Sequence, residues 1–178
     1  PGALVLRDVA FRAPLLVPEG AARDCCVELA PRDDGMAFRV LGRLAPDGSE
    51  WSEHATGIVT SVAAAAPAPL DVDAIAARCT RASERFDTPR TSPHLRFGPH
   101  WDVVRRIDYG DGEALVTLEL APELADDLAA YPLHPALLDM ATGICQRLLP
   151  GFDPARDFHV PLSYGEVVLH APLARELR

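Results

Sequence analysis

One acidic side chain stands inside an otherwise apolar helical pattern. The stretch 131–149 reads YPLHPALLDMATGICQRLL, and Asp139 lies among apolar residues that recur at helical spacing. A carboxyl group in such surroundings loses hydration, which disfavours its charged form and keeps the acid protonated. A protonated carboxyl group can donate a proton, as a general acid must. An Asp in a helix can equally face solvent or bond to a neighbouring backbone group, and the pattern alone leaves both interpretations open.

The same stretch predicts the element that positions Asp139, a helix over 134–149. Pro135 suits the first helical position, because the amide that proline lacks has no partner there. The apolar residues that share one face of this helix are Ala136, Leu137, Met140, Ala141, Ile144, Cys145 and Leu148. A helix with so broad an apolar face has to be covered, and a curled sheet can cover it.

The rest of the chain supplies the strands for such a sheet. Alternating apolar and polar residues predict strands over 4–9, 24–29, 36–44, 51–61, 101–109 and 114–120, with one or two more within 158–170. The turn PRDDG at 31–35 predicts that 24–44 is a hairpin, and the Gly-Asp-Gly at 110–112 predicts a second one. The predicted fold class is therefore α+β, with an antiparallel sheet wrapped around a central helix, which is a hotdog fold.

A segment rich in Ala and Pro, AAAAPAP at 63–69, predicts an internal boundary. It is followed by a short helix expected over 71–79, with Asp71 as the cap, and by an irregular stretch at 80–99 that holds three prolines. We expect residues 1–62 to be one unit, 63–99 a linker with a short helix, and 100–178 a second unit that contains the central helix.

Composition excludes several classes of function. The 178 residues carry a net charge of −9, which argues against a nucleic-acid partner, because no basic stripe is available for phosphates. No apolar run reaches the length of a membrane span, and no signal peptide opens the chain. The four cysteines form no CxxC pair, so we expect reduced thiols, no structural metal and a cytoplasmic location.

Five segments together resemble the dehydratase domain of modular polyketide synthases. They occur in the order of that family and cover nearly the whole chain. The most specific is LHPALLD at 133–139, which resembles the family's second catalytic motif. The others are LRDVAFRAPLLVPEG at 6–20, WSEHATGIV at 51–59, FGPHW at 97–101 and VPLSYGEVVLH at 160–170.

The resemblance implies a double hotdog whose first unit is incomplete in this sequence. It also implies elimination of water from a 3-hydroxyacyl thioester, carried on the phosphopantetheine arm of an acyl carrier protein, with no metal or organic cofactor in the domain. Asp139 corresponds to the family's acid. Residues expected along the substrate tunnel are His134, Gly143, Phe97, Pro99 and Tyr164. The implied partners are the carrier protein, other synthase domains and a second copy of the chain.

Two departures from the family keep alternatives open. The HxxxGxxxxP motif, which carries the family's catalytic base, is absent, so we expect that His to lie outside this sequence. Gly143 occupies the position, one helical turn after Asp139, where many members have Gln or His. A related double-hotdog isomerase, cyclase or thioester hydrolase is therefore an alternative, as is a catalytically inactive structural or dimerisation domain that spaces neighbouring domains.

Overall fold

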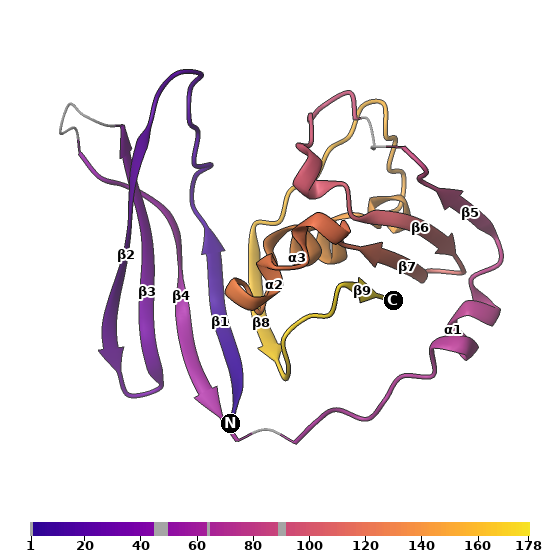
Figure 1. Ribbon diagram of the computed structural model, residues 1–178, viewed down its shortest axis with the longest axis horizontal. Helices are drawn as coiled ribbons and strands as arrows, with labels where there is room; N and C mark the ends of the chain where they lie inside the picture. The colour runs from indigo at the N-terminus through magenta and orange to yellow at the C-terminus, as the bar shows by residue number, and fades with distance from the viewer. Residues whose placement is uncertain (1, 45–49, 64, 89–91) are drawn as a thin grey trace. The chain divides into compact units, whose positions relative to one another are not determined.

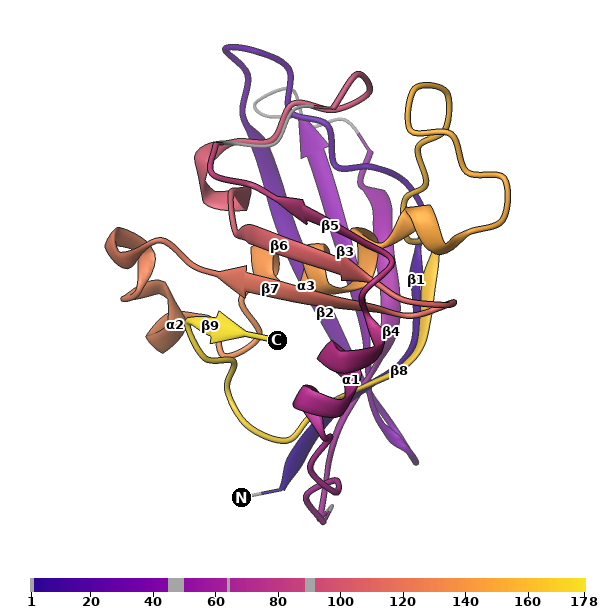
Figure 2. The ribbon, with the colours of Figure 1, turned by 90° about the vertical axis from the view of Figure 1, so that its right-hand side faces the viewer.

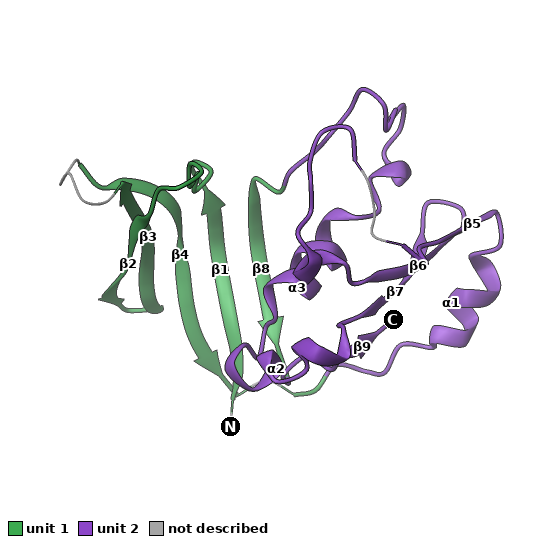
Figure 3. Cartoon of the chain, turned by 45° about the horizontal axis from the view of Figure 1, so that its top comes forward, with its two compact units in different colours: residues 1–66, 161–170 green, residues 67–160, 171–178 purple. Residues whose placement is uncertain are grey.

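The computed structural model describes residues 2–44, 50–63, 65–88 and 92–178, and these form two compact units (Figure 1). Unit 1 comprises residues 1–66 and 161–170, and unit 2 comprises residues 67–160 and 171–178 (Figure 3). The expected boundaries at 62 and 99 thus differ from those of the compact units, because the described residues of 67–88 and 92–99 belong to unit 2 and 161–170 belongs to unit 1.

Unit 1 is an antiparallel sheet of five strands in the order β2-β3-β4-β1-β8. The strands are β1 (Ala3–Phe11), β2 (Arg23–Arg32), β3 (Gly35–Leu44), β4 (Ser52–Val62) and β8 (Ser163–Leu169). The predicted hairpin over 24–44 is confirmed as β2 and β3. Gly35 follows its turn with a φ of +145°, and a Cβ there would lie 2.7 Å from the carbonyl oxygen of Val59, so this position requires glycine.

Strand β8 shows how tertiary pairing brings distant parts of the chain together. Only residues 163–169 of the predicted 158–170 segment form a strand, and they pair with β1, more than 150 residues earlier, from Leu4↔Leu169 to Ala10↔Ser163. Among the described residues of unit 1 no helix covers the sheet. The apolar side chains of edge strand β2 are correspondingly exposed, with Val27 at 60% and Leu29 at 57%.

Unit 2 combines a sheet of four strands, in the order β5-β6-β7-β9, with the central helix. The elements are α1 (Val72–Arg78), β5 (Ala82–Arg85), η1 (Pro99–Trp101), β6 (Val104–Tyr109), β7 (Ala114–Glu119), η2 (Pro122–Leu124), α2 (Asp127–Ala130), α3 (Pro135–Gly143), η3 (Gln146–Leu148) and β9 (Glu176–Leu177). Helix α3 packs against β7 and η1, and Figure 2 shows it behind β6 and β7.

The predicted helix over 134–149 was too long at its C-terminal end. Helix α3 ends at Gly143, and the carbonyl of Gly143 accepts a hydrogen bond of 3.0 Å from the side chain of Gln146. Three residues of 3-10 helix follow as η3. Glycine has a low helix propensity, and a side chain that takes the carbonyl replaces the backbone amide that would have continued the helix.

The core of unit 2 forms where α3 meets the sheet. The helix buries Ala136, Leu137 and Met140, as the apolar pattern predicted, but Ala141 is exposed. The sheet and its connections contribute Val103, Val104, Ile107, Tyr109, Leu118 and Leu120. The prediction of an irregular 80–99 segment was wrong at β5, because residues 82–85 pair with 106–109 of β6, a contact that local sequence does not reveal.

An ion pair fastens α1 to the turn between β6 and β7. Asp71 caps α1 by accepting from the amide of Ala74 at 2.9 Å, as predicted. At the other end of α1, the guanidinium of Arg78 donates two hydrogen bonds of 2.8 Å to the carboxylate of Glu113. These hydrogen bonds hold the pKa of Glu113 below its ordinary value.

The Glu113 contact predicts a pH dependence of stability. A depressed pKa in the folded state stabilises the protein above the unfolded pKa, about 4.3, and that contribution is lost as the pH falls through the folded pKa. Glu113→Gln should therefore lose stability less steeply than the parent between about pH 5 and pH 3. Urea midpoints measured across this range test it, with Glu123→Gln as a control for removing one carboxylate. Equal slopes for Glu113→Gln and the parent would contradict the prediction.

Candidate functional site

Helix α3 begins at Pro135, and proline suits the first position of a helix. His134 precedes it with an extended backbone (φ −58°, ψ 125°), and its carbonyl accepts the amide of Leu138 at 3.0 Å. No side chain caps this helix, and Pro135 removes one of the amides that would have needed a partner. The start of the helix is therefore fixed by local sequence, and it places Asp139 on the second turn.

Asp139 is half-buried, and its carboxylate is held by the indole of Trp101. The Nε1–H group of Trp101 donates a hydrogen bond of 2.8 Å to Oδ2 of Asp139. The acid that the sequence singled out is thus oriented by a residue 38 positions earlier, on a different element.

Trp101 ends the single 3-10 turn η1. The amide of Trp101 donates to the carbonyl of Gly98 at 3.0 Å, and the amide of Asp102 donates to the carbonyl of Pro99 at 3.2 Å. Pro99 at the first position of the turn fixes its φ angle and lacks an amide that would need a partner. The sequence GPHW therefore builds a tight turn that presents the indole to α3.

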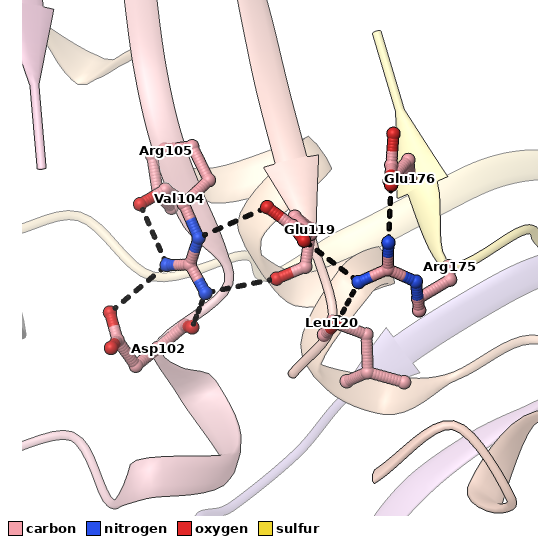
Figure 4. Close-up of polar contacts among 7 residues, drawn as sticks. All are labelled: Asp102, Val104, Arg105, Glu119, Leu120, Arg175 and Glu176. Atoms are coloured by element: carbon pink, nitrogen blue, oxygen red, sulfur yellow. Dashed lines mark hydrogen bonds and ion pairs between the residues drawn. The ribbon is translucent and has the colours of Figure 1, made fainter. Parts of the chain in front are cut away.

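A polar network fastens the end of η1 to the sheet (Figure 4). Arg105 on β6 donates to the carbonyl of Asp102 at 3.0 Å, and its guanidinium lies 3.5 Å from the carboxylate of Asp102. The same guanidinium lies 3.6 Å from the carboxylate of Glu119, which also accepts a hydrogen bond of 2.7 Å from Arg175. Arg175 in turn contacts Glu176, so β9 joins the network. Charge-assisted hydrogen bonds of this kind are stronger than neutral ones, which favours a rigid η1.

His134 is buried, and the contacts of its side chain are to residues before α3. Its Nε2 atom lies 3.8 Å from the carboxylate of Asp127 on α2, and its ring packs edge-on against Tyr131. Its Nδ1 atom is buried and has no hydrogen-bond partner among the described residues. These contacts place His134 against α2 and Tyr131, and its place along the substrate tunnel stays a prediction.

Gly143 leaves open space one helical turn after Asp139. A Cβ atom built at this position meets no atom of the described residues within 4 Å, apart from its own helix backbone and chain neighbours. The side chain of Gln146 holds the backbone at this point. It donates to the carbonyl of Gly143 at 3.0 Å and to the carbonyl of His159 at 2.7 Å, and it accepts from the amide of His159 at 3.0 Å. The end of α3 is thus anchored by Gln146, which contacts the carbonyl of Gly143, while the Cβ direction of Gly143 is open among the described residues.

The remaining tunnel predictions are placed as follows. Phe97 is partly buried against the core of unit 2, and Pro99 is exposed at the start of η1. Tyr164 lies in unit 1 on β8, where its ring packs edge-on against Phe11 at 5.6 Å. The turn that Pro99 opens packs against α3, and it is Trp101 of this turn that contacts Asp139. The tunnel role of all three residues stays a prediction.

Sequence reasoning missed Trp101 and Arg105 as parts of this site. Trp101 was noticed only as the aromatic residue of the FGPHW segment. A partial signal was available, since a tryptophan in a polar, proline-bounded turn has an indole N–H that needs an acceptor when it is partly buried. No local signal links Arg105 to Asp102, because that contact depends on how β6 leaves the turn.

No residue set in the described part of the chain is suited to hold a metal. Within 2–44, 50–63, 65–88 and 92–178, no three His, Cys, Asp or Glu residues gather as a metal-binding group. Over the same residues, the structure has no helix long and apolar enough to span a membrane.

Comparison with known proteins decides the family. The family model described as "Polyketide synthase dehydratase N-terminal domain" matches residues 59–178. The chain belongs to the polyketide synthase dehydratase family. Polyketide synthase ThaG of Burkholderia thailandensis is 31% identical to it, over 98% of this chain but only 3% of that protein. Polyketide synthase GfsE of Streptomyces halstedii is 31% identical, over 76% of this chain and 4% of that protein.

Solved dehydratase domains share the fold of this family member. A dehydratase domain of a trans-AT polyketide synthase from Brevibacillus brevis superposes with a TM-score of 0.83 at 21% identity, covering 96% of this chain and 60% of that one. The dehydratase domain of the CurH module of curacin polyketide synthase superposes with a TM-score of 0.77 at 26% identity, covering 97% and 62%. The hotdog fold class is thereby confirmed, and the chain spans about three fifths of these domains.

Proposed function

We propose that this chain forms part of a dehydratase domain that eliminates water from a 3-hydroxyacyl thioester. The observation that carries the proposal is the half-buried carboxyl group of Asp139, held on α3 by the Trp101 indole. The family of the chain and its LHPALLD segment support the same assignment. The proposed substrate is carried on the phosphopantetheine arm of an acyl carrier protein, with other domains of a synthase as further partners.

The proposed reaction needs one base and one acid. The base removes the proton from C2, which the thioester carbonyl acidifies, and the electron pair of that C–H bond forms the C2–C3 double bond. The C3–O bond breaks, and the hydroxyl leaves as water after taking the proton of Asp139, which becomes a carboxylate. Positioned acid–base groups suffice for this chemistry.

We assign the acid to this chain and the base to a histidine beyond these 178 residues. The motif that carries the base in the family, HxxxGxxxxP, does not occur in this sequence. The matched dehydratase domains are longer than this chain, which leaves room in such domains for a further segment. A homodimeric assembly and a cytoplasmic location stay predictions of the same proposal.

Product mass tests the proposal and separates it from its alternatives. The full-length protein is incubated with a 3-hydroxyacyl thioester of N-acetylcysteamine, and the products are analysed by mass spectrometry. Loss of one water from the thioester is the expected result. A product of unchanged mass with a new structure would indicate an isomerase or cyclase, a free acid would indicate a thioester hydrolase, and unconverted substrate would favour an inactive domain.

A further inference from the structure

We infer that Trp101 is a positioning residue that determines which oxygen of Asp139 carries the transferable proton. This inference rests on the proposed function, because it concerns the acid of that reaction. It starts from the hydrogen bond of 2.8 Å between Nε1 of Trp101 and Oδ2 of Asp139.

The chemistry of the two groups makes this bond directional. An indole N–H can only donate, so the oxygen that it contacts must accept. In a protonated carboxyl group one oxygen bears the hydrogen and the other is the better acceptor. With Oδ2 engaged by Trp101, the proton of Asp139 is placed on Oδ1, and the carboxyl plane is held in one orientation. A general acid gains from such positioning, because its proton must lie within hydrogen-bond reach of the leaving oxygen.

The position of the donor is fixed from outside the helix. Trp101 is the last residue of η1, and the carbonyl of Asp102, which follows it, accepts a hydrogen bond from Arg105. Glu119 and Arg175 extend this anchor across β7 to β9 (Figure 4). The indole therefore approaches Asp139 from a turn held by the sheet.

The helix itself offers no donor one turn after the acid. Gly143 is four residues after Asp139, a spacing at which side chains on a helix meet, and its Cβ direction is empty within 4 Å. A longer side chain can therefore be introduced at this position. A Gln there could donate to Asp139, since Gln and Asp at this spacing form hydrogen bonds on helices. The empty position thus provides a rescue site for the lost donor.

The test compares Trp101→Phe alone with two double variants in the full-length protein, using the N-acetylcysteamine thioester. Phe keeps an aromatic ring but removes the N–H donor. We expect kcat to fall about ten- to a hundredfold, the loss typical of one hydrogen bond to an ionisable group, with KM changed less than threefold. Adding Gly143→Gln should recover at least half of the lost activity on a logarithmic scale. Adding Gly143→Met, which matches Gln in size and in helix propensity but lacks a donor, should not.

Folding is monitored by circular dichroism and thermal melting. To separate packing from hydrogen bonding, 3-benzothienylalanine is introduced at position 101, because it has the shape of tryptophan without the N–H group. It should lower kcat as Trp101→Phe does. A kcat within twofold of the parent in this variant, or equal recovery by Gln and Met, would overturn the inference.

Asp139→Asn distinguishes failure of the inference from failure of the proposed function. If Asp139→Asn abolishes dehydration while loss of the indole N–H has no effect, the proposed function stands and the positioning role is overturned. If Asp139→Asn leaves dehydration intact, the proposed acid is wrong, and the inference falls with it.

Discussion

Asp139→Asn is expected to reduce dehydration by about 10²- to 10⁴-fold, the contribution typical of a positioned general acid. Asn has nearly the shape of Asp, and its side-chain oxygen can still accept the hydrogen bond from Trp101. The substitution therefore keeps the local geometry but removes the proton that the departing hydroxyl needs. We expect KM to change little, because the lost interaction develops in the transition state.

The measurement is the initial rate of water loss from a 3-hydroxyacyl thioester by the full-length protein. Asp126→Asn is the matched control, since Asp126 is exposed at the start of α2 and its side chain makes no capping hydrogen bond. It should retain the activity of the parent. Comparable rates for Asp139→Asn and Asp126→Asn would exclude Asp139 as the acid. Unchanged melting temperatures of both variants would show that the rates report chemistry and not folding.

Leu137→Ala is expected to destabilise unit 2 by about 2–5 kcal/mol, the cost of emptying a fully buried leucine site. Leu137 lies two residues before Asp139 on α3, and its side chain is completely inaccessible to solvent. It packs in the cluster that joins α3 to β6 and β7, which includes Ile107 and Leu118. A cavity at this point loosens the contact between the helix and the sheet. The Asp139 side chain should therefore be held less firmly in its orientation.

Urea unfolding followed by Trp101 fluorescence measures this loss in unit 2. All variants are made in a Trp51→Phe background. Trp51 lies in unit 1, and its fluorescence would otherwise add to that of Trp101. Leu138→Ala is the matched control on the same helix. Its side chain is only half-buried, so it should cost about 1 kcal/mol. Equal costs for the two leucines would show that α3 does not pack on the sheet through the face that contains Leu137.

The fold could be predicted from sequence wherever it depends on local spacing. Turn residues, caps and apolar periodicity predicted the hairpin at 24–44, a second hairpin around 110–112, the cap at Asp71 and the start of α3 at Pro135. The strand expected over 101–109 begins only at Val104, because Pro99–Trp101 forms the 3-10 turn η1. The motif around Asp139 was also visible, because an acid within an apolar helical pattern is a local signal. The apolar helix and the strand pattern also predicted the hotdog fold class, which the family resemblance supported and the superposition with solved dehydratase domains confirms.

Local spacing did not reveal contacts between distant segments. It missed β5, since 82–85 becomes a strand by pairing with β6, and it placed 163–169 with the second unit although these residues pair with β1. It also extended α3 beyond Gly143, where the Gln146 side chain, itself bonded to the backbone of His159, takes the Gly143 carbonyl. These features depend on hydrogen-bond partners supplied by other parts of the chain.

The same division applies to the site. The sequence by itself determined that Asp139 lies on a helix with an apolar face, because the helical period places neighbours three and four residues apart together. Only the tertiary structure decided what holds its carboxyl group. Trp101 is 38 residues away, and it meets Asp139 because Arg105 and the sheet fix the turn that carries it. A hydrogen bond needs two groups within about 3 Å, and only the packing of the helix against that turn brings them so close.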